Sequence, residues 1–298
     1  MVTTKQAYKD YLSKEKNYSR HTLTAYLNDI SEFESFLKVE DETLELEEVN
    51  YGQVRSWIVS LVENGISNTS VNRKMSSLKS FYKFLLKSKQ IELNPLQKHK
   101  SLKTPKKVQI PFSEKELSMI FEHNEFADDF EGIRNCLIIE LFYTTGMRRA
   151  ELINLETANF NEYAKTLKVL GKRNKERILP LLDSTLLLLK RYLIERNKLT
   201  EVKDGHLLIL NKRGHKVSET FVYRLINDYF SNVSEKVKKS PHVLRHSFAT
   251  HMLNNGADLN SVKELLGHAS LSSTQIYTHS SLAELKRVYQ DAHPRNQK

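Results

Sequence analysis

A polar, basic stretch without helical or strand periodicity separates two long segments that do carry apolar periodicity. It runs from Leu96 to Pro111, contains Pro105, and follows directly on Asn94-Pro95. Such a composition is typical of an extended linker, because proline and closely spaced lysines disfavour regular structure. At 298 residues the chain is long enough for two ordinary hydrophobic cores. We therefore predict an N-terminal domain over residues 1–95, a basic linker over 96–111 and a C-terminal domain over 112–298.

The N-terminal domain has four segments in which apolar residues recur at helical spacing. Helices are expected over residues 4–14, after Ser19, around Trp57, and after a start at Ser67 or Thr69. Serine and threonine favour these starts because their side chains accept hydrogen bonds from the first free backbone N–H groups. The acidic stretch from Glu40 to Glu48 is interpreted as a solvated turn.

The C-terminal domain is predicted to be mostly helical with a small β-hairpin. Ser113 and Glu116 form a capping-box pattern, and Gly146 interrupts a long apolar helix. Residues 166–170 alternate as a strand, residues 171–175 form a turn, and the chain returns from Arg177 to Leu179. The fold class is thus mainly α: a four-helix N-terminal domain and a mostly helical C-terminal domain with a small β-hairpin or sheet.

Positive charge is concentrated around the linker. The whole chain has 46 Lys and Arg against 36 Asp and Glu, a formal net charge of +10. The window from Val71 to Lys107 has eleven basic residues and one acid, Glu92, so it accounts for the whole surplus. Lys79, Lys83 and Lys87 recur every four residues on one helix face. This row fits either a solvated face or a contact with the phosphates of a nucleic acid.

Near the C-terminus, residues 240–279 concentrate histidine, arginine and tyrosine. His242 and Arg245 are three apart on one helix face, Leu266-Gly267-His268 ends the next helix, and Tyr277 follows. Arginine binds phosphate oxygens with two donors, histidine exchanges protons near neutral pH, and tyrosine can form a covalent intermediate. Each motif alone is more often structural, and His246, His251 and His279 receive no task. Together the motifs favour a site for a phosphodiester.

Other classes of site lack their signatures. No Cys/His cluster has zinc spacing, no carboxylate cluster suits Mg²⁺, and no phosphate-binding glycine loop is present. We therefore predict neither a metal nor a cofactor. Cys136 is the single cysteine and begins an apolar run, so no disulfide forms within the chain. No stretch resembles a signal peptide or a membrane span, which predicts a soluble cytoplasmic protein without a membrane partner.

Five motifs in order resemble the tyrosine recombinase (phage integrase) family, and within it the Xer subgroup. They are Thr-Gly-Met-Arg-Arg-Ala-Glu-Leu from Thr145, Gly-Lys-Arg-Asn-Lys-Glu-Arg from Gly171, His-Val-Leu-Arg-His from His242, Leu-Gly-His from Leu266, and Ile-Tyr-Thr-His from Ile276. The resemblance spans both domains. Arg173 stands in the hairpin turn where the family commonly has glycine.

The resemblance implies a role for each matching residue. Tyr277 would attack the scissile phosphate and form a 3′-phosphotyrosyl link. Arg148, Arg245 and His268 would hold the non-bridging oxygens, Lys172 would protonate the leaving 5′-oxygen, and His242 would act as general base. Glu151 would support the site from behind. Fixed cations of this kind stabilise the charge that develops on phosphate without needing a metal.

The resemblance also implies a biological setting. The substrate would be a double-stranded DNA recombination site, cut during the resolution of chromosome dimers at cell division. Expected partners are a second Xer-type recombinase, in a tetramer on two sites, and a septal DNA translocase. Two alternatives stay open: a mobile-element integrase of the same chemistry, and a DNA-binding relative that does not cleave. The tail from Ser281 to Lys298 is expected to dock on a neighbouring subunit, or else to pack on its own domain.

Overall fold

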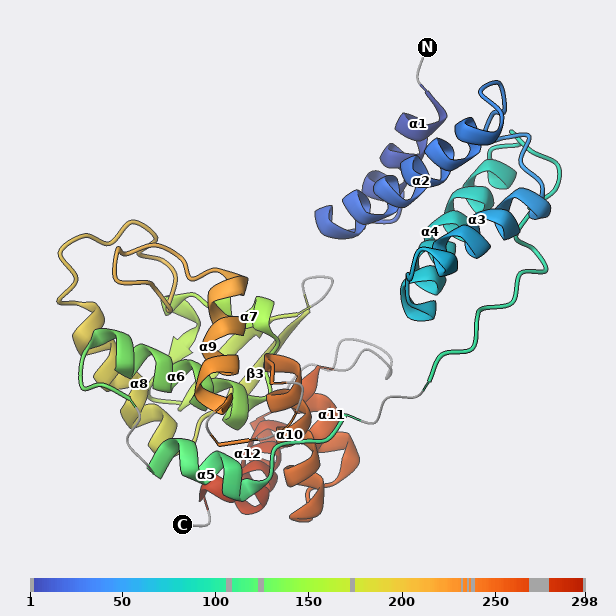
Figure 1. Ribbon diagram of the computed structural model, residues 1–298. Coiled ribbons are helices and arrows are strands. Elements are labelled where there is room, and N and C mark those ends of the chain that lie inside the picture. The colour runs from blue at the N-terminus through green and yellow to red at the C-terminus, as the bar shows by residue number, and fades with distance from the viewer. Residues whose placement is uncertain are drawn as a thin grey trace. The chain divides into compact units, whose positions relative to one another are not determined.

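The computed structural model describes residues 3–105, 109–122, 126–171, 175–231, 233–234, 236, 239–267 and 279–296 (Figure 1). The chain divides into two compact units, Met1–Lys107 and Val108–Lys298. The predicted fold class is confirmed: both units are mainly helical, and the second contains a small antiparallel sheet. No helix in the described ranges is long and apolar enough to cross a membrane.

The first unit is a helical bundle. Its elements are α1 (Thr4–Asp10) with a π-helical turn (Tyr11–Glu15), α2 (Arg20–Glu40), α3 (Tyr51–Glu63) and α4 (Asn68–Lys87). Ser19 and Ser67 cap α2 and α4 by accepting from backbone N–H groups at 3.3 Å, as their positions predict. Trp57 packs on Phe33 with ring centroids 4.9 Å apart in a core to which all four helices contribute.

Two irregular segments of the first unit are packed more closely than their composition suggests. In the acidic stretch between α2 and α3, Leu46 is buried and its carbonyl accepts from the Tyr82 hydroxyl at 3.0 Å. Beyond α4, Leu96 is buried, and the Asn72 side chain both donates to and accepts from the Leu102 backbone at 2.9 Å. Packing on the first unit therefore extends into the stretch whose composition is that of a linker.

The second unit is built around the apolar helix α6. Its helices are α5 (Glu114–Glu122), α6 (Phe130–Thr145), α7 (Arg149–Ile153), α8 (Asp183–Arg196), α9 (Glu219–Ser231), α10 (Pro241–Asn254), α11 (Leu259–Leu266) and α12 (His279–Ala292). Helix α6 packs against α8, α9 and α10. Gly146 ends α6 with φ of 60°, and a Cβ there would lie 2.4 Å from the Phe248 ring, so only glycine fits.

The sheet has strand order β1–β2–β3, formed by β1 (Phe160–Asn161), β2 (Thr166–Leu170) and β3 (Glu176–Pro180). The predicted hairpin is present, with Leu167 opposite Leu179. The short strand β1 was not predicted, because two residues carry no periodic signal. Helix α11 packs on β3, which brings the hairpin close to the end of α11.

Helix α11 is capped at both ends, and its C-terminal end is the one that the sequence predicts. Asp258 accepts from Asn260 and Ser261 backbone N–H groups at 2.9 and 3.0 Å, and Gly267 ends α11 with φ of 63°. Helix α12 packs against α10, and its Leu285 and Tyr289 are buried in the core of the second unit. Within this single chain the tail thus packs on its own domain, and docking on a neighbouring subunit stays a prediction.

Candidate active site

Arg148 lies in the turn between α6 and α7, where its backbone and side chain bind the same carboxylate. Its backbone N–H donates to Glu151 Oε2 at 2.7 Å, and its Nη1 donates to Glu151 Oε1 at 2.8 Å. The Arg148 side chain is 26% exposed, whereas the Glu151 side chain is 4% exposed. Part of the guanidinium is therefore open to a ligand while the carboxylate that orients it is buried.

Glu151 is also held from β3. Arg177 donates from Nη1 to Oε1 at 2.9 Å and from Nη2 to Oε2 at 2.8 Å. Burial by itself raises the pKa of the Glu151 carboxyl, but hydrogen bonds and charge from Arg177, together with the donors of Arg148, lower that pKa to about 2. Glu151 is thus an ionised carboxylate at neutral pH, and it can accept hydrogen bonds from Arg148 and Arg177 together.

Arg245 lies on α10, and its guanidinium reaches two other segments. Nη1 donates to the carbonyl of Gly146, after α6, and Nη2 donates to the carbonyl of Leu266 at 2.6 Å. Burial, and then the positive charges of Arg148 and Arg177, lower the pKa of Arg245 to about 10. Arg245 therefore keeps its charge at neutral pH.

The C-terminal end of α11 joins the three arginines. The carbonyls of Leu265, Leu266 and Gly267 accept in turn from Arg177 Nε at 2.8 Å, Arg245 Nη2 at 2.6 Å and Arg148 Nη2 at 3.2 Å. These carbonyls have no partner within the helix, and a helix C-terminus carries partial negative charge. Three guanidinium groups around one carboxylate leave a local excess of positive charge, which suits an anion such as a phosphodiester.

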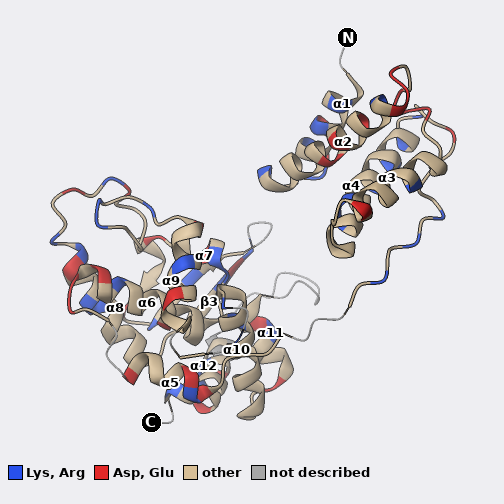
Figure 2. Ribbon diagram, in the orientation of Figure 1, with Lys and Arg blue, Asp and Glu red and all other residues tan. Residues whose placement is uncertain are grey.

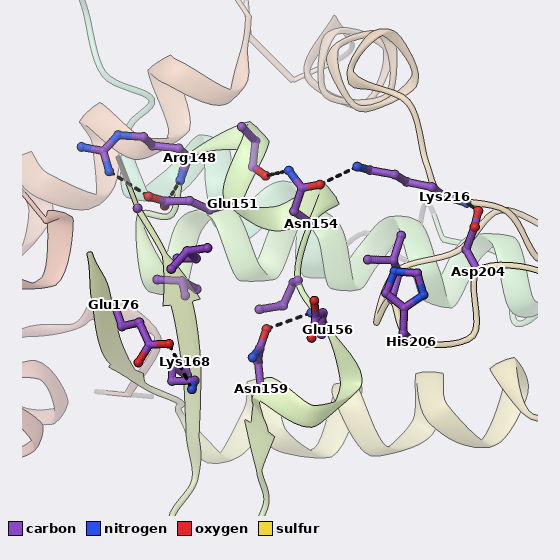
Figure 3. A pocket seen from close by; sticks show the side chains of 16 residues that line it. Arg148, Glu151, Asn154, Glu156, Asn159, Lys168, Glu176, Asp204, His206 and Lys216 are labelled. Atoms are coloured by element: carbon purple, nitrogen blue, oxygen red, sulfur yellow. Dashed lines mark hydrogen bonds and ion pairs between the residues drawn. The ribbon is translucent and has the colours of Figure 1, made fainter. Parts of the chain in front are cut away.

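A cavity of about 830 Å³ opens beside this cluster. Figure 3 shows Arg148 and Glu151 at one end and Asp204, His206 and Lys216 at the other. The lysines of its wall already have partners: Lys168 pairs with Glu176 at 3.2 Å, and Lys216 donates its side chain to Asn154. The cavity adjoins the partly exposed guanidinium of Arg148.

Family models match most of the chain. The phage integrase family matches residues 112–284, and the N-terminal SAM-like domain of phage integrases matches residues 6–89. The chain belongs to the phage integrase family. Its members are tyrosine recombinases, enzymes that cleave and rejoin DNA, so the predicted family and enzyme class are confirmed.

Named relatives and a solved structure extend the comparison. The chain is 40% identical to tyrosine recombinase XerC of Staphylococcus carnosus over 290 residues, covering 96% of each chain. It is 38% identical to tyrosine recombinase XerC of Bacillus subtilis, covering 96% of this chain and 94% of the relative. The pre-cleavage complex of XerH recombinase with its difH substrate is 27% identical, with a TM-score of 0.68, over 95% of this chain and 83% of that one. The tail from Leu285 to Arg295 also resembles XerC more than XerD, and the relatives named above are XerC proteins.

The structure describes three of the six residues proposed as catalytic. Arg148 and Arg245 meet through the end of α11, and His242 is exposed in the first turn of α10, on the face that carries Arg245. Lys172, His268 and Tyr277 lie outside the described residues. Of the described residues next to them, Gly171 donates to the Lys175 carbonyl at 2.8 Å, and Gly267 ends α11.

Two further residues, one of them outside the motifs, have clear positions. His251, which the sequence left without a task, is buried and hydrogen-bonded through Nδ1 to the Tyr143 hydroxyl at 3.0 Å. Arg177 is the last residue of the motif from Gly171, and the resemblance implies no role for it. The sequence does contain an indication of its role, because a charged residue at an inward-facing strand position must find a buried partner. Which partner it finds depends on the packing of α11 and α7 against β3.

Proposed function

We propose that this recombinase cuts and rejoins DNA through a 3′-phosphotyrosyl intermediate formed by Tyr277. The observation that carries the proposal is the joining of Arg148 and Arg245 at the end of α11, with Glu151 behind Arg148. In such a mechanism the two guanidinium groups bind the non-bridging oxygens. They stabilise the charge that grows there, and as preorganised donors they need no rearrangement during the reaction.

The other roles follow from the order of motifs in the chain. Free tyrosine has a pKa of about 10, so Tyr277 needs a base or a stabilised anion, and His242 is the proposed base. His268 follows Gly267 and would complete the phosphate site. Lys172, in the hairpin turn, would protonate the leaving 5′-oxygen. No metal takes part in this scheme, and cleavage is expected to continue in EDTA.

For the biological role we propose resolution of chromosome dimers at cell division. The support is the XerC name shared by curated relatives that match nearly the whole chain. A XerH complex with its difH substrate supports double-stranded DNA as the substrate. The proposed assembly is a tetramer with a second Xer-type recombinase on two sites, together with a septal DNA translocase. Because the proposed substrate is chromosomal, we expect the protein in the cytoplasm. A mobile-element integrase of the same chemistry is the alternative.

The decisive experiment is covalent trapping on a nicked suicide substrate, in which the cut strand end diffuses away. The parent protein should form an adduct that withstands denaturation, and Tyr277→Phe should bind DNA but form none, because only the attacking hydroxyl is removed. Tyr163→Phe is the matched control, since Tyr163 is a fully exposed tyrosine of the same unit. An adduct with Tyr277→Phe, or none with the parent protein on a cognate site, would refute the proposal.

A further inference from the structure

Arg177 is a buried arginine whose side-chain donors point in two directions toward two different elements. Its side chain is 5% exposed. Nη1 and Nη2 grip both oxygens of Glu151 on α7, and Nε donates to the Leu265 carbonyl at the end of α11. Its backbone belongs to β3, the strand that follows the hairpin turn. Three elements that carry or flank proposed catalytic residues therefore meet on this side chain.

We propose that Arg177 is a positioning residue, which sets the mutual placement of the two phosphate-binding arginines by tying Glu151 to the end of α11. It rests on the proposed function, because the placement matters only if Arg148 and Arg245 act on a phosphate. Arg177 itself has no access to the substrate, so it acts through Glu151 and through the α11 carbonyls.

Three arginines share the C-terminal end of α11. Arg177, Arg245 and Arg148 each take one of the consecutive carbonyls of Leu265, Leu266 and Gly267. Consecutive carbonyls of one chain cannot shift independently. If the end of α11 moves, the anchors of all three arginines move with it. Arg177 is the most buried of the three anchors, and it is the one tied to the sheet.

Arg177 also packs closely on Gly267. A Cβ at Gly267 would lie 3.1 Å from both Cδ and Nη1 of Arg177, tighter than an ordinary contact. Gly267 also has φ of 63°, which favours glycine. The Arg177 side chain is thus packed against the backbone of Gly267, the residue before His268. Removing the Arg177 side chain would leave a space at the position where α11 stops.

Lysine cannot replace the contacts of Arg177 with Glu151 and Leu265. A guanidinium offers a rigid fork of five donors, and Arg177 uses it to reach Glu151 and Leu265 together. A lysine ammonium keeps the charge but concentrates its donors at one point. Substitution by lysine should therefore keep Glu151 ionised while losing part of the geometry, whereas methionine loses both.

The experiment compares Arg177→Met and Arg177→Lys with the parent and with Arg196→Met. Arg196 is the matched control, because it is a buried arginine of the same unit that donates to the carbonyls of Gly205 and Leu207 at 2.8 and 2.9 Å. Single-turnover cleavage of a suicide substrate is measured at saturating DNA, well below the melting temperature of each variant. DNA affinity and thermal unfolding are measured beside it.

We expect Arg177→Met to bind DNA like the parent and to cleave about 100-fold more slowly, the loss typical of a reacting group misplaced by about 1 Å. Arg177→Lys should lose about tenfold, since one contact in the fork is kept. Arg196→Met should lose stability but not cleavage rate. In a double-mutant cycle, Arg177→Met should slow Glu151→Gln much less than it slows the parent, because Arg177 acts through that carboxylate.

Parental cleavage by folded Arg177→Met would overturn the inference. So would a cleavage loss in Arg196→Met equal to that in Arg177→Met, because the effect would then be general destabilisation. If Arg177→Met does not fold, Arg177→Lys carries the test, and a parental rate there would overturn it. Failure of the proposed function is distinguishable, since the parent protein itself would then form no covalent adduct.

Discussion

In the part of the chain that the structure describes, each unit contains a buried carboxylate that accepts from both terminal nitrogens of an arginine, but the two pairs are built differently. In the first unit Arg73 donates from both Nη atoms to Asp29 at 2.6 Å, and Ser77 adds a third donor at 2.6 Å. The Arg73 side chain is 50% exposed. In the second unit Arg177 grips Glu151 from inside the protein, and Arg148 shares the same carboxylate.

The difference lies in how many cations share one acid. Around Asp29, Lys74 also pairs with Glu32, so two acids face Arg73 and Lys74 and the charges nearly cancel. That pair joins α2 to α4. Around Glu151, Arg148 and Arg177 share a single carboxylate, and the charge of the nearby Arg245 guanidinium adds to theirs, so positive charge is left over. We infer that a short supply of acid, rather than a large number of basic residues, suits the second cluster to binding a phosphate.

The abundance of basic residues in the first unit is therefore a different feature from the charge of the site. Figure 2 shows lysine and arginine recurring along α4 and the extended segment after it. Some of these side chains have intramolecular partners: Lys79 donates to the His99 carbonyl at 3.2 Å, and Lys87 pairs with Glu15 at 3.3 Å. We expect the first unit to set DNA affinity and the second to set cleavage rate.

The largest effect that separates the units is expected at Lys172. As general acid it would contribute about 10²–10⁴ in rate, so Lys172→Ala should be severely slow on ordinary DNA. In a substrate with a 5′-bridging phosphorothioate the leaving group is a thiolate, which needs no protonation. That substrate should restore much of the cleavage rate of Lys172→Ala. Arg245→Ala should show no such rescue. Lys175→Ala is the matched control in the same turn, and rescue of that variant in place of Lys172→Ala would transfer the acid role.

Next in size is the loss of a phosphate-binding arginine. Arg148→Ala or Arg245→Ala should lower single-turnover cleavage by about 10²–10³, the effect of removing one preorganised donor. DNA binding should change little, because we expect the first unit to supply most of the affinity. Lysine at either position should be nearly as slow, since a point charge cannot make the bidentate contact. Parental cleavage by Arg245→Lys would remove the phosphate-binding role.

A smaller effect is expected when each carboxylate is neutralised. Glu151→Gln should lower the free energy of unfolding by about 3 kcal/mol, because it leaves Arg177 buried without a counter-charge. Asp29→Asn should cost less, since the half-exposed Arg73 can turn to water. Chemical denaturation measures both. At saturating DNA only Glu151→Gln should also slow cleavage, and a slowing by Asp29→Asn would erase the contrast between the units.

The same carboxylate gives a pH prediction. The pKa of Glu151 is lowered from 4.5 to about 2 against the opposing effect of burial. A carboxyl with a lowered folded-state pKa stabilises the fold above its ordinary pKa, and this contribution is lost as pH falls from 4.5 toward 2. The stability of Glu151→Gln should thus vary less with pH in that window than the stability of the parent. Parallel pH profiles would argue against an ionised Glu151.

The smallest effect concerns the lysine row of α4. Each phosphate contact adds about 0.9 to the slope of log affinity against log salt. Replacing Lys79, Lys83 and Lys87 by glutamine should flatten that slope without changing cleavage at saturation. Among the described residues Lys83 is exposed and has no ion-pair partner, so Lys83→Gln alone should produce a clear share of the change. An unchanged slope would make the row a solvated face.

Local signals in the sequence were enough for the helices, the hairpin and the ends that position the site. Gly146 and Gly267 end their helices in the left-handed conformation and Asp258 caps α11, and the residue type at each position is enough to predict that a helix starts or stops there. The order of motifs likewise sufficed for the family. In both cases the information lies within a few residues of where it acts.

Only the tertiary structure decided what gathers the site. The carbonyls of Leu265, Leu266 and Gly267 are present in any sequence, so nothing in their side chains announces that three arginines from distant segments bind them. The burial of Leu96 and the contacts of the Asn72 side chain with the Leu102 backbone could not be predicted from the sequence either, because they too depend on how distant segments pack. Backbone acceptors carry no residue-specific signal. Their partners are chosen by the packing of whole elements, which brings Arg148, Arg177 and Arg245 to one helix end.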